Sequence, residues 1–200
     1  MDQRDKALQD TTPTFMVPYF GTFEPLETNG LRMLMSSNGV WMEVRLAWIY
    51  LRVQVAPPLK VNVPYGAVEP AMEFAFGKLP RAMVSQFIDI AKLHSPNECA
   101  AWVIWNQTTN SIRLQMLDDV VTVGPGHVVN NLPRLEDDEH IILDLHSHGK
   151  THAHFSRTDN TDDRGVCKIA GVVGNLDSST ITTTFRLSAN GLLQSLPFEL

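Results

Sequence analysis

The segment HSHGKTHAHFSRTD, residues 146–159, constrains the fold more than any other part of this chain, because it follows a strand-like apolar run without a break. Side chains two residues apart on a strand point to the same face, about 6.6 Å apart along the chain. His146 and His148 can therefore present their imidazoles to one ion, while Ser147 points the other way. The ten residues between His148 and Asp159 are enough to leave the strand, cross a loop and begin a helix that returns the carboxylate over the strand end.

These residues form a candidate zinc site. Zinc accepts neutral imidazole nitrogen at roughly 2.0–2.1 Å and carboxylate oxygen at a similar distance, and catalytic zinc usually has three protein ligands plus water. His152 and His154 also have the right chemistry to be ligands. We expect both to be solvated loop histidines, because a catalytic zinc needs an open position.

The carboxylates near this site could also have purely structural roles instead of binding or supporting a metal. Ser156 and Asp159 also fit a helix capping box, in which the serine hydroxyl satisfies a free backbone amide. Asp144 shares a strand face with His146 by alternation, so it could orient a ligand or be a plain surface carboxylate. The residues alone therefore allow either role for each aspartate.

The motif resembles the signature of the JAMM, or MPN-plus, zinc metalloproteases, which contain the JAB domain. That signature is a histidine, any residue, a histidine, seven residues, a serine, two residues and an aspartate, with a glutamate upstream. His146, His148, Ser156 and Asp159 satisfy it. Glu98 is the candidate glutamate, because in SPNECAAWVIW it follows a predicted helix and stands at the head of a buried strand.

The resemblance implies roles for these residues. Glu98 would be the general base and later the acid, zinc would lower the pKa of water toward ~7, and Ser156 would help to stabilise the tetrahedral oxyanion. The reaction would be the hydrolysis of an amide or isopeptide bond. The resemblance covers roughly residues 79–193 and implies a mixed sheet of cytidine-deaminase-like topology flanked by helices. Gly149 departs from the pattern, since many family members carry proline after the second histidine.

Residues 144–175, with the N-terminal extension, also resemble family members encoded in the bacterial PRTRC plasmid system. That cassette resembles a ubiquitin-like conjugation set, so the implied substrate is a ubiquitin-like protein or its conjugate. The alternative is a non-catalytic scaffold of the MPN type, although such relatives typically lose ligand residues. A nucleic-acid-associated factor is a third class, and the formal net charge of -6 counts against it.

The pattern of the chain predicts an α/β protein with a β-rich N-terminal extension, residues 1–72, and a second domain, residues 73–200. Prolines and glycines in residues 1–39 favour short extended pieces and turns. Residues 40–55 alternate like a strand, with a change of phase near Ala47 that indicates a bulge or break. Pro57 and Pro58 should stop this strand, and residues 59–63 could return as its antiparallel partner.

The second domain alternates between helical and strand patterns. Pro80 suits the first turn of a helix in which Met83, Phe87 and Ile90 recur at helical spacing, and which should end near His94. Five strand candidates follow: residues 99–105, a one-sided partner through residue 116 after the turn NQTTN, and residues 141–148, 169–173 and 181–187. A loop containing GPGH and an acidic cluster precedes the third, and Asn190-Gly191 offers a hairpin turn after the last.

The N-terminal residues and the cysteine content limit the cellular compartments that we expect for the protein. The first residues, MDQRDKALQD, are polar and charged, so they predict neither a secretory signal nor a membrane anchor. We expect a soluble cytoplasmic protein without membrane or nucleic-acid partners. Cys99 and Cys167 are too few for a disulfide scaffold, and we expect buried free thiols.

Overall fold

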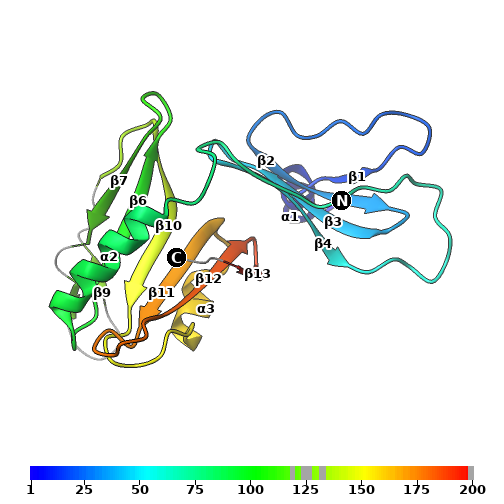
Figure 1. The fold of residues 1–200 in the computed structure, drawn as a ribbon. Helices are drawn as coiled ribbons and strands as arrows, with labels where there is room; N and C mark the ends of the chain where they lie inside the picture. Colours follow the sequence, from blue (N-terminus) through cyan, green and yellow to red (C-terminus); the bar gives the residue numbers. More distant parts are fainter. Residues whose placement is uncertain (118–119, 123–127, 131–133, 198–200) are drawn as a thin grey trace. The chain divides into compact units, whose positions relative to one another are not determined.

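The computed structural model describes residues 1–117, 120–122, 128–130 and 134–197, in two compact units, Met1–Lys78 and Leu79–Leu200 (Figure 1). The units divide six residues later than the boundary at 72/73 used above, which falls inside the strand Ala71–Phe74. The expected fold class is confirmed, because the first unit is rich in strands and the second combines a mixed sheet with helices.

The first unit is a five-stranded sheet in sequential order, antiparallel except for the parallel pair β1–β2. Its elements are α1 (Gln3–Thr11), β1 (Thr14–Met16), β2 (Gly30–Ser36), β3 (Gly39–Arg45), β4 (Ile49–Ala56) and β5 (Ala71–Phe74). α1 was not predicted from the sequence, because it has no buried residue and therefore no periodic apolar positions. Its start is instead stabilised by the Asp2 carboxylate, which accepts a hydrogen bond from the Arg4 backbone N–H at 2.9 Å.

The predicted break near Ala47 is a tight turn. Leu46 and Ile49 exchange backbone hydrogen bonds of 2.9 and 3.3 Å, so β3 and β4 form an antiparallel hairpin around two intervening residues. The phase of the alternation changes because its two halves belong to different strands. β4 ends directly before Pro57, as predicted, but the expected strand at residues 59–63 is wrong. β4 pairs with β3 and β5 instead, and the apolar side chain of Val61 is 68% exposed.

A buried carboxylate lies in the first unit. Glu43 is fully buried and accepts hydrogen bonds from the Tyr50 hydroxyl at 2.6 Å, the Arg32 Nε at 2.5 Å and the Leu26 backbone N–H at 3.2 Å. Burial, followed by the contact with Glu43, raises the pKa of Tyr50 to about 12. Three donors thus offset the cost of removing this charge from water.

The second unit contains a six-stranded sheet in the order β13-β12-β11-β10-β6-β7, in which only β10–β11 is parallel, and a two-stranded sheet β8-β9. Its elements are α2 (Arg81–His94), β6 (Ala100–Asn106), β7 (Ser111–Met116), β8 (Val120–Thr122), β9 (Val128–Asn130), β10 (Glu139–Ser147), α3 (Arg157–Asp162), β11 (Lys168–Gly174), β12 (Thr182–Ala189) and β13 (Leu192–Leu196). The predicted helix, the five strands and the Asn190-Gly191 turn are confirmed. The GPGH loop lies outside the described residues.

α2 has the expected length, but its buried stripe is shifted. Phe87 is fully buried, as expected, whereas Met83 and Ile90 are only half-buried and their neighbours Val84 and Ala91 are fully buried. Within the described part of the chain, no helix is long and apolar enough to cross a membrane.

The strand registers assign the central residues of the large sheet to its two faces, because directly paired residues point the same way. Leu145, Gly171 and Phe185 are paired in succession on one face, which is apolar and buried. Asp144, Ala170 and Arg186 are paired on the other face. By alternation His146 also lies on this second, polar face, near the end of β10.

Candidate metal centre

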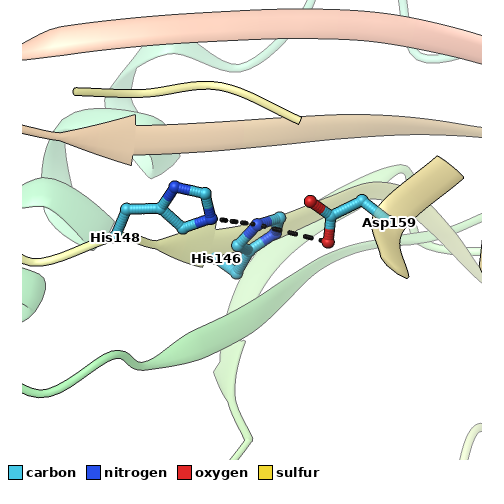
Figure 2. A group of neighbouring side chains, drawn as sticks. All are labelled: His146, His148 and Asp159. Carbon is cyan, nitrogen blue, oxygen red and sulfur yellow. Dashed lines mark hydrogen bonds and ion pairs between the residues drawn. The ribbon is translucent and has the colours of Figure 1, made fainter. Parts of the chain in front are cut away.

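The side chains of His146, His148 and Asp159 meet at the end of β10 (Figure 2). His146 Nε2 lies 3.2 Å from His148 Nε2 and 3.6 Å from Asp159 Oδ1, and the three ligand atoms all lie within 4.8 Å of one another. Tetrahedral zinc with bonds of roughly 2.0–2.1 Å would hold its ligand atoms about 3.3 Å apart. The donor set therefore suits zinc in its chemistry, and two of its ligand distances are close to that edge, so the group could hold a metal ion.

The two imidazoles are positioned by the sheet. His146 is paired with Ala100 of β6 and Val172 of β11, so a strand supports it on each side. The His148 backbone N–H donates to the Val173 carbonyl at 2.8 Å, which extends the pairing with β11 by one residue. Both histidines thus stand on a rigid strand end, with alternation placing them on one face.

Asp159 is positioned by the first turn of α3. Its backbone N–H donates to Ser156 Oγ at 3.1 Å, and its Oδ2 accepts the Ser156 backbone N–H at 2.6 Å, so the capping box is confirmed. The other carboxylate oxygen, Oδ1, faces His146. Capping and metal binding therefore do not exclude one another, because they use different oxygens. The Ser156 hydroxyl accepts a bond in this arrangement and keeps its proton for donation.

The electrostatics of the group favour the protonation states that bind a metal. Burial lowers the pKa of His146, with the nearby Asp159 carboxylate opposing the shift. Burial raises the pKa of Asp159, but the hydrogen bonds from Ser156 and the charges of the two histidines together outweigh it, so the net pKa is lowered. A neutral imidazole and an ionised carboxylate are the forms that zinc requires.

Glu98 lies beside this group on the segment that leads into β6. Two reciprocal hydrogen bonds of 2.9 Å join the next residue, Cys99, to Ser147: one from the Ser147 backbone N–H to the Cys99 carbonyl, one from the Cys99 N–H to Ser147 Oγ. Glu98 thus lies two residues before Ala100, the strand partner of His146. It is exposed. Burial lowers the pKa of His146, and the charge of Glu98 is one of the weaker influences that oppose this shift.

His152 and His154 are exposed and do not belong to the ligand group of the described residues. The Nδ1 atoms of His154 and His148 lie 3.3 Å apart, so His154 contacts the His148 ring nitrogen that is not shared with His146. His154 Nδ1 also lies 2.9 Å from the His152 carbonyl oxygen. Among the described residues, the candidate ligand group therefore has three members, His146, His148 and Asp159.

The backbone conformation at residue 149 explains why this chain has glycine where many family members have proline. Its φ is +53°, which proline, with φ near -65°, does not adopt. A Cβ at this position would lie 2.4 Å from the carbonyl oxygen of Pro96. The chain after His148 therefore passes close to the loop that precedes Glu98, and only glycine fits there.

A network of ion pairs between buried and half-buried side chains lies next to the candidate metal group and was not predicted from the sequence. Lys168 Nζ lies 2.6 Å from Asp144 Oδ2 and 2.7 Å from Asp163 Oδ1, and Arg186 Nη2 lies 2.5 Å from Asp163 Oδ2. Burial lowers the pKa of Lys168, but the two carboxylates outweigh it and the net pKa is raised. A small pocket lies between this network and the metal group, lined by Asp144, His146, Phe155, Asp159, Asp162, Asp163, Lys168 and Ala170. The partners of each ion pair are distant in sequence, so no spacing rule points to them.

A mixed sheet with two histidines at a strand end and a carboxylate at the start of the next helix defines an α/β protein with a candidate metal-binding site. Residues 80–188, more than half of the chain, match the family model described as prokaryotic homologs of the JAB domain, and the chain belongs to that family. The expected relationship to JAB-domain proteins is thereby confirmed. Residues 2–75 match a domain of unknown function, DUF2016. No curated protein and no solved structure matches the chain.

Proposed function

We propose that this chain is a zinc-dependent metallopeptidase that hydrolyses an amide or isopeptide bond, in the manner of a deubiquitinase. One observation carries the proposal: His146 Nε2 lies 3.2 Å from His148 Nε2 and 3.6 Å from Asp159 Oδ1, both close to the edge of a zinc tetrahedron, and the three ligand atoms lie within 4.8 Å of one another. Three protein ligands with an open position are typical of catalytic rather than structural zinc.

The residues around this group divide the work. His146, His148 and Asp159 would hold zinc, which supplies Lewis-acid chemistry and lowers the pKa of water when bound. Glu98 takes the proton of the attacking water and later delivers it to the leaving amine. Its exposed carboxylate, close enough to His146 for its charge to act on that imidazole, suits this exchange of protons. The Ser156 hydroxyl, at the start of α3, donates to the developing oxyanion.

The proposed substrate is a ubiquitin-like protein or its conjugate in the cytoplasm. This part of the proposal is supported by the resemblance of residues 144–175 to members of the PRTRC plasmid system. The match of residues 2–75 to a second conserved domain is compatible with such an extended member of the family. Nucleic acid and membrane partners are not part of this proposal.

The test combines metal analysis with cleavage. The purified full chain is stripped with a chelator, reloaded with zinc and assayed for stoichiometric metal and for cleavage of a linear fusion between the cassette's ubiquitin-like protein and a reporter. Glu98→Gln should keep the metal and lose turnover, whereas His148→Ala should lose both. Glu136→Gln is the matched control, because it neutralises another exposed glutamate of the same unit. It should retain full activity.

The outcomes separate the candidate functions. A wild-type protein that binds no stoichiometric zinc refutes the metal site. A protein that binds zinc but leaves the fusion uncut at every enzyme concentration supports the non-catalytic scaffold. Equal turnover of the wild type and Glu98→Gln would refute the proposed base while leaving the metal site intact.

A further inference from the structure

The helix that carries Asp159 has little to hold it against the sheet. α3 has six residues, RTDNTD, and none of them is buried. A helix this short is unstable in isolation. Because it has no apolar face, packing against the core does not fix its position either. The capping box of Ser156 and Asp159 closes only the first turn upon itself. Other contacts must therefore determine where the Asp159 carboxylate lies relative to the histidines.

Arg186 of β12 supplies these contacts at three points along the α3 segment. Its Nε and Nη2 donate to Asp163 Oδ2 at 2.9 and 2.5 Å, and its Nη1 donates to Asn160 Oδ1. Its guanidinium also lies over the ring of Phe155, 3.7 Å from the centroid. Arg186 and Asp163 are 5% and 3% exposed, so these interactions are shielded from water.

The contact at Asp163 reaches Asp159 through one backbone hydrogen bond, because the Asp163 N–H donates to the Asp159 carbonyl at 3.0 Å. Lys168 of β11 holds the same carboxylate from a second side and joins it to Asp144, two residues before His146 on β10. The two cations and the two carboxylates balance in charge. The Asp159 carboxylate is thus not needed to neutralise the network and stays free for a metal.

From this geometry we propose that Arg186 is a positioning residue for the metal site: with Lys168, it clamps α3 to the sheet and holds Asp159 at ligand distance from His146. The inference rests on the proposed zinc site but not on the identity of the substrate. In this proposal the clamp determines how tightly the site binds a metal and with what coordination geometry. It takes no part in a step of the reaction.

The test measures metal binding by the folded, full-length protein. Zinc dissociation constants are determined by competition with a chromophoric chelator, and the visible absorption of the Co²⁺-loaded protein reports the coordination geometry. Arg186→Gln removes the arginine contacts of the clamp and leaves those of Lys168. Asn160→Ala, at an exposed position, removes only one contact and keeps the buried ion pair. Arg113→Gln is the matched control, because it removes a bidentate pair with Glu139, with contacts of 3.0 Å, elsewhere in the same sheet.

We expect the zinc dissociation constant to rise at least about tenfold in Arg186→Gln, as for other residues that orient metal ligands, and severalfold in Asn160→Ala. The Co²⁺ spectrum should change in both, while Arg113→Gln matches the wild type. Arg186→Lys, which keeps the charge but not the planar fork, should restore affinity only in part. Wild-type affinity and spectrum in folded Arg186→Gln, or in Asn160→Ala if the first variant does not fold, overturn the inference. Failure of the wild type itself to bind zinc refutes the proposed function instead, and the clamp with it.

Discussion

Gly149 offers the sharpest test of the geometry around the site, because its substitution has two separable costs. An alanine in the left-handed conformation, at φ +53°, costs about 1–2 kcal/mol. Its Cβ would also lie 2.4 Å from the Pro96 oxygen, where ordinary contacts begin at 3.4 Å. The two backbone segments must therefore separate by about 1 Å, and overpacking of this kind costs about 1–3 kcal/mol. We expect Gly149→Ala to lower the free energy of unfolding by about 2–5 kcal/mol.

Gly165→Ala is the matched control. Gly165 has φ +85°, but a Cβ there would meet no atom within 4 Å, so only the conformational cost of about 1–2 kcal/mol remains. Both glycines belong to the second unit, so urea denaturation of the metal-free chain compares the same unfolding transition. Gly149→Pro, which restores the residue of many family members, should destabilise more than alanine because its φ is fixed near -65°.

We expect the same displacement in Gly149→Ala to lower the turnover of the proposed reaction. Gly149 follows His148 directly, and Pro96 lies two residues before Glu98, so separating them moves the proposed base away from the histidines. A shift of about 1 Å in a catalytic group can lower turnover by about 10²-fold. Equal losses of stability in Gly149→Ala and Gly165→Ala would refute the steric argument, and a fully stable Gly149→Pro would refute the described loop conformation.

Three further changes test other contacts of the two units. Ser147→Ala leaves the Cys99 N–H without its acceptor, so we expect unfolding in urea to show a loss of about 1–3 kcal/mol at unchanged zinc content; an unchanged midpoint contradicts this. His154→Ala removes the neighbour of His148 Nδ1, and competition assays should show about tenfold weaker zinc binding, against complete loss in His148→Ala; unaltered affinity would exclude such a role. Burial raises the pKa of Tyr50 to about 12, so the stability due to its neutral phenol is complete below pH 10 and is lost as the pH rises through 12. The test is the phenolate absorbance of the folded wild type minus that of Tyr50→Phe. A difference that already appears near pH 10 would contradict the raised pKa of Tyr50.

The fold of the second unit was largely predictable because its strands carry the signals that packing requires. Residues 99–105 are continuously apolar, and β6 is buried on both faces. Ile112 and Leu114 alternate with exposed residues, and β7 lies at the edge of the sheet. The fold of the first unit was harder to predict from the sequence. LKVNV at residues 59–63 has a strand-like alternation, but β4, its expected partner, is already paired on both sides. α1 has no buried residue.

The ligands of the candidate site were predictable for a different reason. The spacing of His146 and His148 follows from strand alternation, and the link between Ser156 and Asp159 follows from a single helical turn, so each pair is determined locally. The position of Glu98 is not local. It depends on the pairing of β6 with β10, 48 residues apart at Cys99 and Ser147, and only the family signature pointed to it.

The choice of Asp159 as ligand is likewise not a local property, because α3 and its end hold three aspartates within five residues: Asp159, Asp162 and Asp163. Their different environments come from the strands beneath them. Asp163 is buried and neutralised by two cations from β11 and β12, whereas Asp162 is exposed. That leaves Asp159, with one oxygen occupied by the cap and the other directed at His146. The cations of β11 and β12 therefore occupy Asp163 and leave Asp159 free for the candidate metal site. The alternation of residues along β12 does not indicate the role that we propose for Arg186.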